Sequence, residues 1–274
     1  MKATVKLRAN ALIGLALVGA VSAMALLSMF WTPYQPLGVN LRMRLKPPSA
    51  DYLLGTDEFG RDILSRIMAG AGTSLTVAAL TVLVALVLGV VVGLAAGYLR
   101  GFIDRVLMVA NDALLAFPGI LLALGVMVVL GANQWGIILA LGLAYAPTAV
   151  RVVRGTVLSL REKEYIEASR VIGNSSLRTV FVHILPNCVA PLVVLATSMF
   201  GWVVLAESAL SFLGLGVPPP APTWGNMLSS GRPYIESAAW LGIAPGVCIA
   251  LTLLGINLLG DALRDWLDPR MEAQ

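Results

Sequence analysis

Residues 74–97 read SLTVAALTVLVALVLGVVVGLAAG, a run without a single charged side chain. About 20 consecutive apolar residues are enough for a helix to cross the hydrocarbon core of a bilayer. The run also carries small residues at Gly89, Gly93, Ala96 and Gly97, and small side chains let helices approach closely in lipid. It therefore predicts a membrane-spanning helix that packs tightly against another helix.

Five further stretches of this kind lie along the 274 residues, at 11–31, 106–131, 135–153, 188–206 and 238–260. Hydrophobic residues make up 58% of the chain and charged residues 12%, whereas a soluble domain carries about 25% charged residues. We therefore predict an all-α integral membrane protein with six spanning helices. The third and fourth spans share one uncharged run, which we divide at the turn-forming sequence GANQWG.

The lysines and arginines are unequally divided between the two sides of this arrangement. Thirteen fall on the side that holds both termini, and six fall on the other side. Because Lys and Arg gather on the cytoplasmic side of membrane proteins, both termini are predicted in the cytoplasm. The pI of about 9.3 thus reflects orientation in a membrane and does not indicate nucleic-acid binding. The first stretch exceeds the apolar length of a signal peptide, so we predict an uncleaved anchor.

Two segments predicted on the outer side are long, residues 32–73 and 207–237. In the first, TDEFGRDILSRIMAG (56–70) predicts a short helix with Thr56 as its N-cap. A capped surface helix and a contact with a partner protein both remain open for its charged cluster, which lacks the ligand pattern of a calcium loop. The cluster comprises Asp57, Glu58, Arg61 and Asp62.

Residues 154–187 form the longest predicted cytoplasmic loop, and their pattern indicates a helical hairpin. Gly173 suits the end of a first helix, and Ser175 or Ser176 can cap a second helix that runs to Pro186. In the first helix one face has a small-residue centre and comprises Tyr165, Ala168, Ser169 and Ile172. From the residues alone this face could dock in a groove on a partner protein, or the helix could rest on lipid headgroups.

Three residues in or beside the spans are candidates for a translocation path or gate. Asp112 lies inside the third span, and a carboxylate there either faces the path or pairs with Arg105 or a neighbouring helix; we favour the pair. Pro118 predicts a kink or break, which is either a gating bend or a tolerated irregularity. Glu207 closes the fifth span, where we favour a solvated helix end over an outer gate.

Other functions find little support in the sequence. An intramembrane enzyme would need a motif such as H-E-x-x-H or G-x-S-x-G, and neither occurs. A transporter working alone would not need the hairpin and would more often show inverted repeats. The single histidine, His183, has no ligand cluster around it and is read as part of the hairpin. Cys188 and Cys248 are predicted to be buried free thiols.

The sequence EASRVIG (167–173) followed by HILPN (183–187) resembles the EAA loop of bacterial ABC importer permeases. Ser169 stands where that pattern has its second alanine, and Ile184 directly precedes Leu-Pro where the pattern leaves a gap. Four more stretches resemble the dipeptide/oligopeptide/nickel permease family, in particular its C-type subunit. They are LLGTDEFGRDILSR (53–66), AFPGILLA (116–123), SFLGLGVPPPAPTWG (211–225) and GDALRDWLDPR (260–270).

The resemblance implies a type I ABC importer permease that forms half of a pathway for di- or oligopeptides in the bacterial cytoplasmic (inner) membrane. A nickel chelate or another small solute is the alternative cargo. The implied partners are a homologous second permease, two cytoplasmic ATPases and a periplasmic or lipid-anchored solute-binding protein. ATP and Mg would be bound by the ATPases, because this chain has no G-x-x-x-x-G-K-[ST] motif. We therefore expect that this chain binds no cofactor and is not an enzyme.

The resemblance also implies that the EAA loop couples this chain to the ATPases. The implied coupling residues are Glu164, Glu167, Ala168, Ser169, Arg170, Ile172, Gly173, Leu185 and Pro186. The expected division of the chain is 1–72 for the N-terminal tail, first span and periplasmic segment, 73–262 for the ABC transmembrane type-1 domain with its EAA loop at 154–187, and 263–274 for a cytoplasmic tail.

Overall fold

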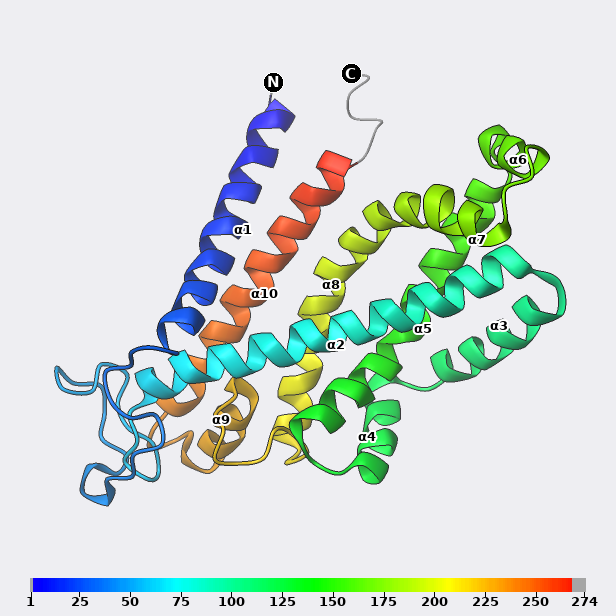
Figure 1. The fold of residues 1–274 in the computed structure, drawn as a ribbon. Helices are drawn as coiled ribbons and strands as arrows, with labels where there is room; N and C mark the ends of the chain where they lie inside the picture. The colour runs from blue at the N-terminus through cyan, green and yellow to red at the C-terminus, as the bar shows by residue number, and fades with distance from the viewer. Residues whose placement is uncertain (1, 268–274) are drawn as a thin grey trace.

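The computed structural model describes the backbone of residues 2–267 and the side chains of residues 9–169 and 171–267. These residues form a helical bundle (Figure 1). Five of its helical stretches are long and apolar enough to cross a membrane. They are formed by α1 (Lys2–Leu27), α2 (Ile63–Leu99), α5 (Gln134–Arg161), α8 (Leu185–Phe212) with the turns before it, and α10 (Trp240–Leu267).

A sixth span is present only as a broken pair of helices. α3 (Gly101–Leu115) and α4 (Gly119–Leu130) are bent by 96° relative to each other. The break falls at Pro118, which has no backbone N–H and disfavours helical geometry in the residue before it. The kink or break predicted at this proline in the span 106–131 is confirmed.

α2 is longer than the predicted span because it begins at Ile63. Asp62 is its N-cap: the carboxylate accepts hydrogen bonds from the Ser65 backbone N–H at 2.8 Å and from the Ser65 hydroxyl at 2.6 Å. The short helix predicted over 56–70, with Thr56 as its cap, is therefore wrong. The Thr56 hydroxyl instead holds the preceding loop, since it accepts from the Lys46 N–H at 2.9 Å.

α2 and α5 pack along a seam of small residues. A side chain added at Gly93 would lie 2.6 Å from the Cβ of Val153, and one added at Gly97 would lie 2.8 Å from the Cβ of Val157. Glycine at these positions therefore sets how closely the two helices approach, as the sequence predicted. In lipid this contact is favourable through packing itself, because lipid tails are as apolar as the side chains.

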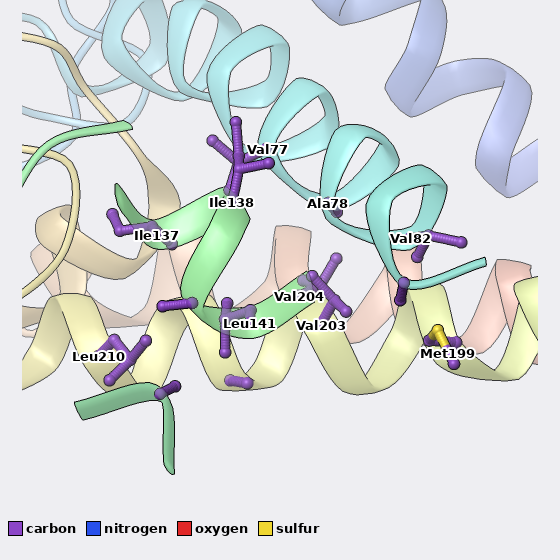
Figure 2. Packing of buried hydrophobic residues seen from close by; sticks show 14 of the residues in the cluster. Val77, Ala78, Val82, Ile137, Ile138, Leu141, Met199, Val203, Val204 and Leu210 are labelled. Carbon is purple, nitrogen blue, oxygen red and sulfur yellow. The ribbon is translucent and has the colours of Figure 1, made fainter. Parts of the chain in front are cut away.

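The centre of the bundle is a cluster of aliphatic side chains from α2, α5 and α8 (Figure 2). Every side chain that Figure 2 labels is buried. They are Val77, Ala78 and Val82 from α2, Ile137, Ile138 and Leu141 from α5, and Met199, Val203, Val204 and Leu210 from α8. These three helices form most of the core, and α1, α4 and α10 add a few buried side chains to it; α1 and α10 lie side by side (Figure 1).

Short elements close the two ends of the bundle. α6 (Glu164–Val171), α7 (Ser176–Arg178) and the π-helical segment η2 (Thr179–Ile184) lie at the end that also holds the start of α1 and the end of α10 (Figure 1). The opposite end carries α9 (Trp224–Gly231) and the loops with the 3₁₀ turns η1 (Leu41–Met43) and η3 (Arg232–Tyr234). The indole N–H of the fully buried Trp224 donates to the Ile67 carbonyl at 3.2 Å, which fixes α9 on α2.

Candidate functional site

The most distinctive feature is the helical hairpin of residues 164–184, formed by α6, α7 and η2. One side chain anchors α6 to the bundle: Ile166 is fully buried in a cluster that includes Val157 of α5, Ile184 of η2 and Cys188 of α8. The anchor fixes the orientation of a helix of only eight residues, which would not be stable alone.

The turn between α6 and α7 has the geometry that the sequence predicted. Gly173 adopts φ of +87°, a conformation that glycine reaches without strain. The Asn174 N–H bonds back to the Ser169 carbonyl at 3.1 Å, the bond that closes a helix with a glycine C′ residue. Ser175 then caps α7, its hydroxyl accepting from the Arg178 N–H at 3.3 Å. The turn of the hairpin is therefore closed by hydrogen bonds between residues close in sequence.

The face of α6 predicted to dock is divided in the structure. Ser169 points into the hairpin, is 5% exposed and has its hydroxyl 3.3 Å from that of the buried Thr179. Ala168 is exposed, and Tyr165 and Ile172 are 46% and 79% exposed. The prediction of one continuous small face is wrong at Ser169, because the second arm of the hairpin covers that side of the helix.

Four of the predicted coupling residues form the outward surface of α6 and of the residue that follows it. Glu164, Glu167, Ala168 and Ile172 are all exposed, and so is Val171, which the sequence reasoning did not single out. The side chain of Arg170 lies outside the described residues. We call Glu164, Glu167, Ala168, Val171 and Ile172 the outer face of α6.

The sequence predicted that the second arm of the hairpin ends at Pro186, and this prediction is wrong. The arm runs through η2 into α8 and forms one helical stretch from Ser176 to Phe212. Leu185 donates its N–H to the Val180 carbonyl five residues back, so the turn before Pro186 is widened. Pro186 lies in the first turn of α8, where its missing N–H is tolerated. Leu185 and Pro186 thus join the hairpin to a spanning helix.

Asp112 pairs with a neighbouring helix, as we favoured, although not with Arg105. Its Oδ1 accepts a hydrogen bond of 2.7 Å from Nη2 of Arg151 on α5, and both side chains are more than half exposed. A second pair lies nearer the hairpin: Asp104 accepts from Nε and Nη2 of Arg154 at 2.6 and 2.8 Å. Two ion pairs therefore join α3 to α5.

Glu207 is not a solvated helix end, because it is only 1% exposed within α8. Its Oε1 accepts from the Ser211 hydroxyl at 2.8 Å, and its carboxyl also hydrogen-bonds the side chain of Thr223. Thr223 is the N-cap of α9 and forms a capping box with Asn226. Glu207 therefore ties α8 to the start of α9, whereas Asp112 pairs with α5.

The outer charged cluster shapes a loop and is not part of a surface helix. Asp57 is 5% exposed and accepts from the N–H groups of Phe59 and Arg61 at 2.9 Å and from Nε of Arg61 at 2.6 Å. Burial raises the pKa of Glu58, whose Oε2 has no hydrogen-bond partner in the described structure. The cluster thus holds the outer loop together from within.

Nothing in the described part of the chain gathers three or more His, Cys, Asp or Glu side chains as a metal site requires. Cys188 is a buried free thiol as predicted, and Cys248 is a free thiol that is only half-buried.

These features define a multi-pass membrane protein that presents an exposed helical hairpin at one end of its bundle. The chain belongs to the family of binding-protein-dependent transport system inner membrane components, whose sequence profile matches residues 89–273. It is similar to the putative peptide transport system permease protein BRA1093/BS1330_II1085 of Brucella suis, with 45% identity over 96% of this chain and 88% of the relative. It is also similar to the dipeptide transport system permease protein DppC of Alkalihalophilus pseudofirmus, with 43% identity over 96% and 86%.

Among solved structures, the fold resembles a chain of the MetNI methionine ABC transporter in inward-facing conformations. The TM-score is 0.59 at 20% identity, over 74% of this chain and 96% of that chain. This likeness shows the fold alone, which is the predicted type I ABC importer permease fold.

Sequence reasoning missed the residues that position the site. Ile166 anchors α6, and its signal was a large aliphatic residue in the first turn of a polar helix. Arg151 and Arg154 pair with α3, and their signal was two arginines one turn apart directly after an uncharged run. The role of Thr223 had no local signal, because its carboxyl partner lies on another helix.

Proposed function

We propose that this chain is a permease subunit of an ATP-driven ABC importer for di- and oligopeptides. It forms half of the pathway and couples transport to ATP hydrolysis through the helical hairpin. Family membership supports the transport role, and the peptide names of the two relatives favour peptide over nickel as the cargo.

The observation that carries the coupling role is the rigid outer face of α6. Val171 and Ile172 are 82% and 79% exposed in the isolated chain, beside the exposed carboxylates of Glu164 and Glu167. Ile166 and Ser169 hold the helix from beneath, so the exposed apolar side chains cannot turn inward. Exposed apolar side chains rimmed by charges on a fixed element mark a surface for a partner protein.

The partner of this face is a cytoplasmic ATPase. In the complete importer a homologous second permease supplies the other half of the pathway, two ATPases bind ATP and Mg, and a solute-binding protein delivers the peptide. This assignment places the hairpin and both termini in the cytoplasm, in agreement with the charge distribution of the sequence. The start of α1, the end of α10 and α6 lie at the same end of the bundle, as this orientation requires (Figure 1).

The test is Ala168→Trp in the reconstituted complex. A large ring on the outer face of α6 would force apart two surfaces in close contact, and overpacking of this kind costs about 1–3 kcal/mol. We expect the variant to insert in the membrane normally, and to lose its ATPase subunits or the stimulation of ATP hydrolysis by loaded binding protein. Leu177→Trp is the matched control, because Leu177 is 71% exposed on α7, off this face.

Subunit retention, stimulated ATPase activity and uptake are the three measurements. Normal values of all three for Ala168→Trp would remove α6 as the coupling element. Cargo is tested separately, by growth of a strain that lacks the importer on dipeptides, longer peptides or limiting nickel. Rescue with nickel alone would reject peptide as the cargo.

A further inference from the structure

The ion pair between Asp112 and Arg151 joins two of the predicted membrane-spanning stretches. Asp112 is eleven residues from the start of α3 at Gly101, and Arg151 is ten residues from the end of α5 at Arg161. At 1.5 Å per residue these separations correspond to about 15 Å along each helix axis. The predicted spans are 106–131 and 135–153, so Asp112 lies inside the third span and Arg151 lies close to the end of the fourth span that is nearer α6.

The pair is open on one side. The side chains of Arg151 and Asp112 are 58% and 57% exposed in the isolated chain. Charged side chains within a span are costly against lipid and face a bundle interior or a water-filled cavity. The open side of the pair must therefore face water or protein.

The surface around the pair supports an aqueous neighbour. On α5 the exposed positions in the half that holds Leu139 and Leu143 are apolar, whereas in the half nearer α6 they are Arg151, Gly155 and Ser159. A side chain added at Gly155 would meet no atom within 4 Å, so the space beside this stripe is open in the isolated chain.

The break between α3 and α4 provides an independent observation. Ala116, Phe117 and Pro118 are non-helical or terminal residues within a bent span, and all three are exposed. Irregular backbone at membrane depth is tolerated only where protein buries it or where it lines a water-filled cavity. This break begins one helical turn beyond Asp112, on the same element.

We propose that Asp112 and Arg151 line the translocation pathway and bind the ionised termini of a passing peptide. This inference rests on the proposed function. Asp112 would accept hydrogen bonds from the α-ammonium group, and Arg151 would donate to the α-carboxylate. Arg151 can bind a carboxylate in addition to Asp112, because it donates one hydrogen bond to Asp112 and a guanidinium has five N–H donors. Arg154, by contrast, binds Asp104 with two donors and is more covered.

The first test measures access. Gly155→Cys, in a complete transporter whose native cysteines are replaced by alanine, should react with a small charged thiol reagent and be protected by a saturating peptide. If a second subunit covers this stripe instead of water, the cysteine will not react, and the inference is overturned. This outcome does not depend on whether any Asp112 or Arg151 variant assembles.

The second test measures specificity with peptides that are free, N-acetylated or C-amidated. Arg151→Gln should lower uptake of peptides with a free carboxylate about tenfold and leave the amidated peptide little changed. Asp112→Asn should do the same for the free amino terminus and spare the acetylated peptide. For each peptide, uptake by the variant is divided by uptake by the wild type. The binding protein is the same in both measurements, so its own preference among the three peptides cancels in this ratio.

Asp104→Asn and Arg154→Gln are the matched controls, because they break an ion pair between the same two helices. They should change uptake of all three peptides by one common factor. A common factor for the Asp112 and Arg151 variants as well would show a purely structural pair and overturn the proposal. Absence of ATP-dependent peptide uptake by the wild-type complex would instead reject the proposed function.

Discussion

Gly93 of α2 lies directly against Val153 of α5, so close that a methyl group on Gly93 would be 2.6 Å from the Cβ of Val153. Gly93→Ala should therefore push the two core helices apart and lower the free energy of unfolding by about 1–3 kcal/mol. Thermal unfolding of the purified complex in detergent would measure the effect. Gly72→Ala, on the same helix but with no atom within 4 Å of the new methyl, should change it little. Equal midpoints for the two variants would contradict a tight seam.

Gly173 tests the turn of the hairpin without a steric clash. Its φ is +87°, and a side chain there would meet no atom within 4 Å, so any loss arises from the backbone alone. Gly173→Val should strain the turn and weaken ATPase binding, whereas Gly173→Asn should be milder because asparagine tolerates positive φ. Co-purification of the ATPases reports the difference. Similar losses for Val and Asn would show that the conformation of this residue is not what matters.

Glu207 should stabilise the join between α8 and α9. Glu207→Ala removes the acceptor for Ser211 and the partner of Thr223, and leaves buried polar groups without partners at a cost of about 1–3 kcal/mol. Glu207→Gln keeps an acceptor oxygen and should cost less. The thermal unfolding midpoints of the two variants and of the wild type, measured in detergent, test this difference. A Gln variant as unstable as the Ala variant would show that the carboxyl group itself is required.

Glu58 predicts a pH dependence of stability. Burial raises the pKa of Glu58 in the folded state, so its ionised form is disfavoured there. The stability that the protonated group contributes is complete below the pKa of the unfolded chain and is lost as pH rises through the folded pKa. Glu58→Gln should therefore raise the unfolding midpoint at pH 7 relative to wild type, and the gain should shrink towards pH 4. Glu236→Gln, which removes an exposed carboxylate, is the matched control.

The orientation of the chain can be tested by cysteine labelling in intact cells. Single cysteines at Lys46, Pro220 and Lys163, all exposed, would be introduced after Cys188 and Cys248 are replaced by alanine. A membrane-impermeant reagent should label positions 46 and 220 from outside and leave position 163 unlabelled until the membrane is opened. Labelling at 163 in intact cells would reverse the proposed topology.

The sequence predicted the spans well where a long apolar run carried the signal. It predicted the start of α2 wrongly because Thr56 and Asp62 are both good N-cap residues. The choice between them rests on contacts such as the bond from Lys46 to Thr56, which no local pattern contains. The hairpin turn was predictable, since Gly173 and Ser175 act through their own neighbouring backbone.

Side-chain partners across helices were the harder part. Asp112 was expected to pair, yet Arg151 is 39 residues away in the chain, and only the folded arrangement of α3 against α5 selects it over Arg105. The burial of Glu207 depends in the same way on residues 213–223 folding back over α8. The position of Glu207 near the end of an apolar run predicted a solvent-exposed side chain. That position carried no information on residues 213–223, which cover it.

The helical stretch from Ser176 to Phe212 gives the molecule a mechanical link across the membrane. Its 37 residues correspond to about 55 Å of helix. One end holds Thr179 against Ser169 of the hairpin, and the other holds Glu207 against the cap of α9. The hairpin and the cap of α9 are therefore joined by continuous helical backbone with no loop in between, and the π-helical turn and Pro191 are the places where this backbone can bend.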